Sequence, residues 1–378
     1  MKHKTYPFLD LGTVNAPYAA ALKDAAARVI DSGRYVGGPE NEAFETELAA
    51  LCDAPYAVGV SNGLDALRLI FRALIELGRL RPGDGVIVPA NTYIASVLAV
   101  TDWGLRPVFV EPDAATMNLD TSLVDSACSS DPGIRAVLTV HLYGRACFDA
   151  ALAEAVSRHG LIVVEDNAQA IGADAAIPGL NGSVRTGSLG HAAACSFYPT
   201  KNLGALGDAG AVTTADADIA RAVRALANYG SDRRYHNIYE GFNCRLDPVQ
   251  AAFMRVKLPH LGSETAHRRA LAAVYDESIT NTLVVKPLLD TPDGCVWHQY
   301  VVRTARRDDF LRHLEANGVG YDIHYAVPPH LQPCYERYSG LSLPVTVRLA
   351  SEVVSLPVSG CTSENDARAI SSIINDFS

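Results

Sequence analysis

The sequence predicts an α/β protein whose main domain contains a largely parallel β-sheet covered by helices on both faces. Four short apolar runs recur between residues 86 and 165, and segments with helical periodicity alternate with them. Strands that are apolar on both faces and are separated by helices are typical of a parallel sheet between helical layers. The chain has 378 residues, more than the roughly 250–300 that one hydrophobic core usually supports. A second domain is therefore expected.

Three helices are predicted in the first 80 residues. We expect Asn15 to cap the first helix, which would hold Pro17 in its first turn and end at Gly33. The second helix has an apolar face along residues 44–51, and the third has one along residues 67–74.

The apolar runs that follow predict the strands of the sheet. They are VIVP from Val86, PVFV from Pro107, AVLTV from Ala136 and LIVVE from Leu161. In open α/β sheets, ligands bind at the carboxyl ends of the strands. This rule points to the residues just after the runs, namely 91–93, 141–143 and 166–169.

The last third of the chain has a different pattern and predicts a smaller α+β domain. Helical segments there enclose the strand-like segment CVWHQYVVRT, and a later helix is closed by Gly318. The predicted division is a large α/β domain with an N-terminal arm over residues 1–255 and a small C-terminal α+β domain over residues 256–378.

Composition excludes several classes of function. A formal net charge of -10 argues against binding to nucleic acid or to an anionic membrane surface. The most apolar stretch is interrupted by polar residues, and the first residues do not resemble a signal peptide. The eight cysteines form no CxxC pair and have no zinc-ligand spacing. We expect a soluble cytoplasmic protein with reduced thiols and no metal centre.

The segment FYPTKNLGALGDAG contains the main candidate for chemistry, Lys201. The lysine follows a nearly uncharged, strand-like segment and precedes three glycines, while Asp166 follows another buried strand. A buried amine and a buried carboxylate at strand ends suit a pyridoxal phosphate site, where Lys201 would bind the aldehyde and Asp166 the pyridine nitrogen. Two alternatives stay open: a solvated surface lysine, or a turn-capping Asp166 that pairs structurally with Lys201.

A phosphate needs hydrogen-bond donors, and the segment SNG at residues 61–63 precedes a predicted helix. The free N–H groups and the dipole of a helix N-terminus favour a dianion. An ordinary capped helix start fits the same residues. Ser196 offers one further hydroxyl, and Tyr93 follows a strand where its ring could stack on the pyridine.

These segments belong to an ordered set of motifs. It includes SNGLDAL, VIVPANTYIAS, VHLYG, VEDNAQA, SFYPTKNLGALGD, GFNCRLDPVQAAF and RVKLPHL, and it extends from about residue 8 to about residue 359. The set closely resembles the nucleotide-sugar aminotransferase family often called the DegT family. The resemblance implies the aspartate-aminotransferase-like fold, pyridoxal phosphate fold type I, with pyridoxal 5'-phosphate as cofactor.

The resemblance also implies roles for single residues. Lys201 matches the lysine that binds the cofactor, and Asp166 matches the partner of the ring nitrogen. Gln169 matches the residue beside the ring and its phenolic oxygen, and Tyr93 matches the stacking aromatic.

The phosphate cradle is implied at Asn62, Gly63, Leu64 and Ser196. Many family members have threonine where this chain has Leu64, so only the backbone N–H of Leu64 can serve the phosphate here. Asn243 matches an asparagine that reaches the phosphate from the neighbouring subunit, which implies a homodimer with shared active sites.

The implied reaction is a transamination in which L-glutamate gives its amine and leaves as 2-oxoglutarate. The acceptor would be a dTDP-linked ketosugar aminated at C3, a dTDP-3-oxo-6-deoxyhexose, giving dTDP-3-amino-3,6-dideoxygalactose. Alternatives are C4 amination of a dTDP-4-oxo-6-deoxyhexose, amination of a cyclitol ketone, or a non-enzymatic DegT-like regulator. A sister branch has histidine in place of the lysine and dehydrates sugars, and Lys201 argues against that reaction.

Substrate contacts are predicted from charge and aromatic character. Cationic candidates for the diphosphate are Arg233, Arg234, Lys257 and Arg268, and candidates for the sugar site are Tyr35, Tyr198, His324 and Tyr325. For each of them a solvated or core-packing role is the alternative.

Overall fold

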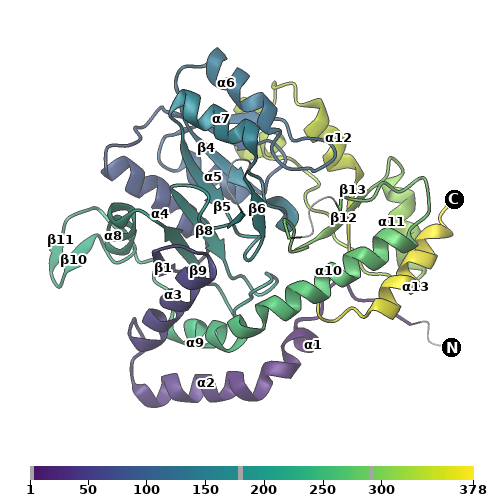
Figure 1. The fold of residues 1–378 in the computed structure, drawn as a ribbon, viewed down its shortest axis with the longest axis horizontal. Coiled ribbons are helices and arrows are strands. Elements are labelled where there is room, and N and C mark those ends of the chain that lie inside the picture. The colour runs from purple at the N-terminus through teal and green to yellow at the C-terminus, as the bar shows by residue number, and fades with distance from the viewer. Residues whose placement is uncertain (1–3, 178–181, 290–292) are drawn as a thin grey trace.

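The computed structural model describes residues 4–177, 182–289 and 293–378. Its centre is a seven-stranded sheet with the order β1-β9-β8-β5-β4-β2-β3 (Figure 1). The strands are β1 (Tyr56–Val60), β2 (Gly85–Pro89), β3 (Arg106–Val110), β4 (Ile134–Val140), β5 (Ile162–Asp166), β8 (Ala192–Ser196) and β9 (Gly210–Thr214). The four apolar runs form β2, β3, β4 and β5, as predicted.

The sheet is mixed. β3, β2, β4, β5 and β8 lie parallel to one another, whereas β9 runs antiparallel between β8 and β1. β1 and β9 were not predicted from the sequence. The carboxyl ends of the parallel strands meet at one edge, so the residues that follow them are gathered there.

Helices cover both faces of the sheet. Alternate residues of β2 enter different cores, because successive side chains of a strand point to opposite faces. Val86 and Val88 pack with α4 (Gly63–Glu76), α5 (Ile94–Thr101) and α8 (Ala217–Leu226), while Ile87 packs with α6 (Val124–Ser130) and α7 (Ala150–His159). A further core joins β1, β8 and β9 to α3 (Pro39–Leu51) and α9 (Pro248–Lys257).

The N-terminal arm differs from its prediction. Asp10 caps α1 (Leu11–Asn15), a 3₁₀ turn spans Ala16–Tyr18, and α2 (Ala19–Ser32) follows and ends at Gly33 with φ 64°. Asn15 therefore closes α1 and does not cap the helix that ends at Gly33. Its Oδ1 accepts a hydrogen bond of 2.9 Å from Lys257 Nζ, so it is engaged elsewhere.

The C-terminal part has its own apolar cluster, built from α10 (Leu261–Ser278), α11 (Arg307–Ala316), α13 (Glu364–Asn375) and the antiparallel pair β12 (Tyr300–Arg303) and β13 (Val353–Leu356). α12 (Pro344–Glu352) instead packs against the core of the large sheet. The predicted boundary after residue 255 falls in the last turn of α9, and the division into two domains stays a prediction.

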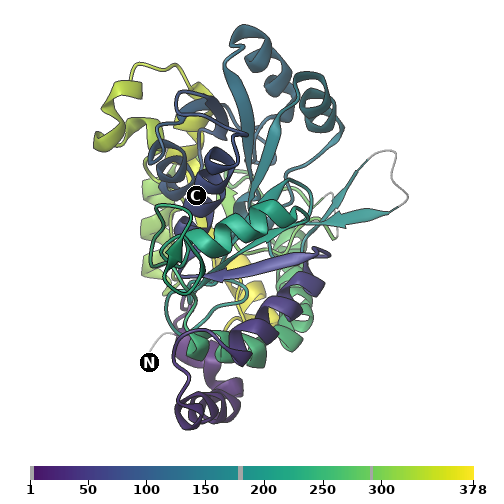
Figure 2. The same ribbon diagram turned by 90° about the vertical axis from the view of Figure 1, so that its left-hand side faces the viewer.

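Two small hairpins complete the fold. β6 (Asp174–Ala176) pairs with β7 (Ser183–Arg185), and β10 (Ser231–Arg233) pairs with β11 (His236–Asn237). The β10–β11 hairpin projects beyond α8, and Figure 2 shows the β6–β7 hairpin reaching out on another side. Over the described ranges, every helix is too short or too polar to cross a lipid bilayer.

Candidate active site

A cavity of about 530 Å³ lies at the carboxyl ends of the parallel strands. Among its lining residues are all the predicted cofactor residues except Asn243, and three of the predicted sugar-site residues. These are Asn62, Gly63, Leu64, Tyr93, Asp166, Gln169, Ser196, Lys201, Tyr198, His324 and Tyr325. The strand-end rule therefore located the cavity.

Asp166 is the last residue of β5, and its carboxylate is held by two donors. Its Oδ2 accepts a hydrogen bond of 2.7 Å from Ser96 Oγ, and its Oδ1 accepts one of 3.2 Å from the backbone N–H of Ala168. Ser96 Oγ also lies 2.8 Å from Thr92 Oγ1. Sequence reasoning missed Ser96, which lies 70 positions before Asp166 in an apolar helix and carries no local signal.

The amine of Lys201 is desolvated in the same cavity. Burial lowers the pKa of Lys201 to about 8, and the negative charge of Asp166 opposes that shift. A lysine with this pKa has a substantial neutral fraction near neutral pH and can act as a nucleophile or base. The turn after it requires Gly204, since a β-carbon there would lie 2.3 Å from the carbonyl oxygen of Pro199.

The N-terminus of α4 forms a cradle at another part of the cavity. Asn62 caps the helix by accepting a hydrogen bond of 2.8 Å from the N–H of Asp65. Within the described ranges, the backbone N–H groups of Gly63 and Leu64 take part in no hydrogen bond. A β-carbon on Gly63 would lie 2.6 Å from Cβ of Ser196, so only glycine fits. Free N–H groups at the positive end of a helix suit a phosphate.

Aromatic rings frame the cavity. Tyr93 and Tyr198 are 52% and 53% exposed, and the ring of Tyr93 lies 5.1 Å from that of Tyr325. Gln169 is held beside them, because its Nε2 donates to the Tyr325 hydroxyl at 3.0 Å and its Oε1 accepts from the N–H of Tyr143 at 2.6 Å. Burial raises the pKa of Tyr325 well above its ordinary value, so its hydroxyl stays protonated.

Two histidines line the cavity, and sequence reasoning named only His324. Nδ1 of His298 lies 3.0 Å from Asn202 Oδ1, and Nδ1 of His324 lies 2.8 Å from Ser355 Oγ. Burial lowers the pKa of both, and the charge of Lys201 adds to the effect. Both imidazoles are therefore neutral near neutral pH. His298 was missed because it lies outside the regular strand β12, in a segment that the sequence analysis treated as strand.

The other predicted residues lie outside this cavity. Asn243, Arg233 and Arg234 are exposed, and Tyr35 is 60% exposed. Arg233 and Arg234 lie on or next to the β10–β11 hairpin (Figure 1).

Lys257 and Arg268 are buried and engaged by the protein. Lys257 Nζ donates to the carbonyl of Gly204 at 2.6 Å, and Arg268 Nη1 donates to the carbonyl of Val358 at 2.5 Å. These contacts argue against the predicted role of either residue in binding an exposed diphosphate.

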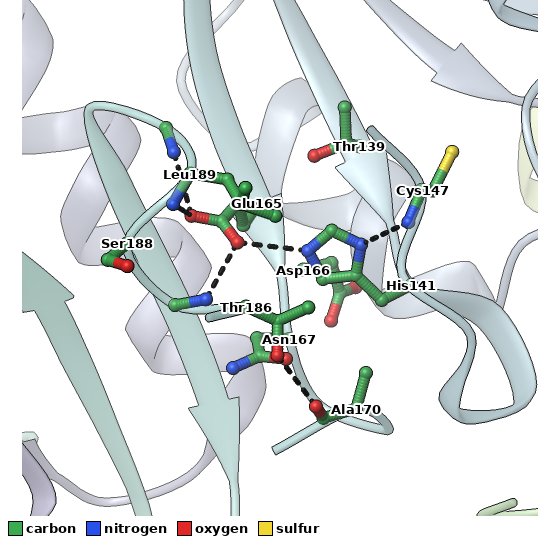
Figure 3. Close-up of polar contacts among 12 residues, drawn as sticks. Thr139, His141, Cys147, Glu165, Asp166, Asn167, Ala170, Thr186, Ser188 and Leu189 are labelled. Atoms are coloured by element: carbon green, nitrogen blue, oxygen red, sulfur yellow. Dashed lines mark hydrogen bonds and ion pairs between the residues drawn. The ribbon is translucent and has the colours of Figure 1, made fainter. Parts of the chain in front are cut away.

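A second carboxylate, Glu165, precedes Asp166 and is fully buried. Figure 3 shows the polar contacts that surround it. Its oxygens accept hydrogen bonds of 2.7–2.8 Å from the backbone N–H groups of residues 187, 189 and 190, and Oε2 lies 2.9 Å from Nε2 of His141. Nδ1 of His141 accepts from the N–H of Cys147 at 3.0 Å, so the ring proton sits on Nε2 and is donated to Glu165. The backbone N–H of His141 donates to the carbonyl of Asp166 at 3.1 Å.

Known proteins share this sequence and fold. The profile of the DegT/DnrJ/EryC1/StrS aminotransferase family matches residues 18–375. The chain is 42% identical to a dTDP-3-amino-3,6-dideoxy-alpha-D-galactopyranose transaminase of Aneurinibacillus thermoaerophilus, over 98% of this chain and 99% of that protein. It is 46% identical to a dTDP-3-amino-3,4,6-trideoxy-alpha-D-glucose transaminase of Streptomyces venezuelae, over 93% of this chain and 90% of that protein.

A solved structure has the same architecture over nearly the whole chain. The crystal structure of S. venezuelae DesV in complex with a ketimine intermediate matches with a TM-score of 0.91 and 44% identity, over 99% of this chain and 98% of the other. These likenesses confirm the predicted fold class and the resemblance on which it was based.

Proposed function

Because the chain belongs to the DegT/DnrJ/EryC1/StrS aminotransferase family, we propose that it transfers the amino group of L-glutamate to C3 of a dTDP-3-oxo-6-deoxyhexose. The product is dTDP-3-amino-3,6-dideoxygalactose. Both relatives described above are named for amino groups at C3, which supports C3 over C4, and the relative covered over 99% of its length is named for the 3,6-dideoxygalactose product. The observation that carries the proposal is the presence of Lys201 and Asp166 in one cavity.

The protein is a pyridoxal-phosphate-dependent aminotransferase, and the cavity fits that cofactor. When bound, pyridoxal phosphate supplies an aldehyde that takes up the donor's amine and a ring that withdraws electrons from the reacting carbon. Lys201 would hold the aldehyde end and Asp166 the ring nitrogen. The N–H groups of Gly63 and Leu64 would hold the phosphate at the N-terminus of α4.

Lys201 moves the proton. With a pKa of about 8, its Nζ can accept the α-proton of the amino donor and hold it beside the reacting carbon. The same atom returns a proton to the sugar carbon in the second half of the reaction. Asp166 would place a negative charge beside the ring nitrogen of the bound cofactor, and the hydroxyl of Ser96 holds that carboxylate in one orientation.

The enzyme acts as a homodimer in which each site receives residues from both subunits. Two predicted site residues are exposed and lie outside the cavity of their own chain, which supports this arrangement: Asn243, which the resemblance assigns to the phosphate, and Tyr35, a candidate for the sugar site. A cytoplasmic location belongs to the same proposal.

Mixed dimers test the shared site. Lys201→Ala and Asn243→Ala are each expected to have low activity as homodimers. A mixed dimer would carry both changes in one site and neither in the other, so refolding the two variants together should restore activity. An inactive mixture in which mixed dimers have formed would contradict sharing.

Product analysis tests the reaction. The purified protein with pyridoxal phosphate and L-glutamate receives dTDP-3-oxo-6-deoxyhexose, dTDP-4-oxo-6-deoxyhexose and a cyclitol ketone separately, and mass spectrometry and NMR locate the new nitrogen. We expect amination at C3. An amine at C4 or on the cyclitol would overturn the substrate assignment. Cofactor binding without transfer to any acceptor would favour the regulator.

A further inference from the structure

Arg268, on α10, carries a buried charge without an acidic partner. It is 7% exposed, and no carboxylate oxygen of the described ranges lies within 4.0 Å of its guanidinium. Its Nη1 donates to the carbonyls of Trp297, His298 and Val358 at 3.2, 3.5 and 2.5 Å. Its Nε is buried and has no acceptor, and within the described structure Nη2 makes no hydrogen bond.

The lack of a counter-ion is unusual for a buried guanidinium. Burying a charge is costly unless a partner compensates for it, and carbonyl dipoles do so only in part. The closest acidic influence is Glu264, whose Oε1 accepts a hydrogen bond of 2.9 Å from the Tyr18 hydroxyl. Burial outweighs that attraction and lowers the pKa of Arg268 to about 10, so the group remains charged. The neighbouring Arg269, by contrast, is paired with Asp293 at 3.1 Å.

The unpaired charge lies next to the catalytic cavity. Arg268 lines one recess together with Lys201, and a second recess together with Thr200, His298 and Gln299. Thr200, Lys201, His298 and Gln299 also line the main cavity. The recesses that Arg268 lines therefore adjoin the main cavity at Lys201 and at His298, whose imidazole is under the charge of both Lys201 and Arg268.

We propose that Arg268 is the binding residue for a carboxylate of the amino donor. The inference rests on the proposed function, because that function requires a donor with two carboxylates to reach Lys201. A bound carboxylate supplies the missing counter-ion and accepts from Nη2, and charge-assisted bonds of this kind are among the stronger hydrogen bonds in proteins. A nucleoside diphosphate is the less suitable ligand, because only a small anion can reach a guanidinium that is 7% exposed.

The test compares Arg268→Gln with Arg269→Gln, a change to the adjacent arginine on the same helix. Binding of glutarate, an unreactive dicarboxylate, to the cofactor-loaded protein is measured by calorimetry. The two half-reactions, with L-glutamate and with the dTDP-amino sugar, are followed separately by absorbance. We expect Arg268→Gln to weaken glutarate binding and the glutamate half-reaction about 10- to 100-fold, since one charged hydrogen bond is lost. The amino-sugar half-reaction and Arg269→Gln should both stay within about twofold of the unaltered protein.

Arg268→Gln could also disturb folding, because Arg268 donates to the carbonyls of Trp297 and Val358. Arg268→Lys is therefore a second variant that controls for a folding defect. It keeps the charge but loses the planar fork, so a loss of glutarate affinity of about three- to tenfold is expected. Unchanged glutarate binding in either variant, or an equal loss in both half-reactions of the folded variants, would overturn the proposal. A loss of dTDP-sugar affinity alone would assign Arg268 to the diphosphate. If the unaltered enzyme does not react with glutamate, the proposed amino donor is wrong. Glutarate binding would still show whether Arg268 binds a carboxylate.

Discussion

Two consecutive carboxylates on β5 have opposite surroundings. Asp166 faces the cavity and accepts two hydrogen bonds, from Ser96 and Ala168. Glu165 faces the other side of the sheet, is fully buried, and accepts four, three of them from backbone N–H groups and one from His141. Successive side chains of a strand point to opposite faces. The end of β5 can therefore present the carboxylate of Asp166 to the cavity while that of Glu165 holds the surrounding backbone in place.

The different surroundings predict different effects of substitution at the two carboxylates. A buried carboxylate with all its lone pairs engaged holds the surrounding backbone in place, and removing its charge leaves donors unpaired. A carboxylate with spare capacity facing a cavity contributes little to stability and is available to a ligand. We therefore expect Asp166 to control activity and Glu165 to control stability.

The largest effect is expected for Asp166→Asn. This isosteric change removes the charge opposite Lys201, and kcat should fall about 100- to 1,000-fold. The free energy of unfolding should change by less than about 1 kcal/mol, because few contacts are lost. Steady-state kinetics and urea unfolding of the apo-protein measure the two quantities. A fall of several kcal/mol in the free energy of unfolding would contradict the proposed difference between the two carboxylates.

Glu165→Gln should give the reverse pattern. The amide cannot accept from all three N–H groups and from His141, so the free energy of unfolding should fall by about 2–4 kcal/mol. Below the unfolding transition, kcat should stay within about threefold of the unaltered enzyme. A hundredfold fall in kcat in a fully folded sample would show that Glu165 acts on the chemistry.

Ser96→Ala should have an intermediate effect on the cavity side. It removes the 2.7 Å hydrogen bond to Asp166 Oδ2, so the carboxylate is less well oriented, and kcat should fall about three- to tenfold. Ser96→Thr keeps the hydroxyl and should recover most of the loss. Equal kinetics for the alanine and threonine variants would mean that the hydroxyl has no such role.

The smallest effect concerns pH. The rate at which apo-protein captures pyridoxal phosphate should rise with pH and level off near pH 8, because the neutral fraction of Lys201 grows up to its pKa of about 8. A lysine with the ordinary pKa of 10.5 would give a rate that rises until about that pH. The charge of Asp166 raises the pKa of Lys201, so Asp166→Asn should move the levelling point to lower pH. Glu165→Gln should leave it in place, and a rise that continues to pH 10 would contradict the depressed pKa.

The features that could be predicted from the sequence are those that depend on the local pattern of residues. Continuous apolar runs located β2 to β5, and the strand-end rule then brought Tyr93, Asp166 and Gln169 to one edge. The sequence did not reveal Ser96, and it assigned Arg268 to a diphosphate without showing that the side chain is buried. The surroundings of both residues depend on partners 70 and 90 positions away that only the fold brings close. The prediction that Asn15 caps the helix ending at Gly33 was wrong, because its Oδ1 accepts a hydrogen bond from Lys257, 242 positions away, and local sequence does not show that contact.

The cradle at Gly63 has a consequence for how this protein can change over generations. The groups that would grip the phosphate belong to the main chain, so replacing Leu64 by many other residues would leave them intact. A single methyl at position 63 would meet Ser196 at 2.6 Å and push the helix away from the strand. In the first turn of α4, substitutions at position 64 would thus spare the groups that retain the coenzyme, whereas almost any substitution at position 63 would displace them.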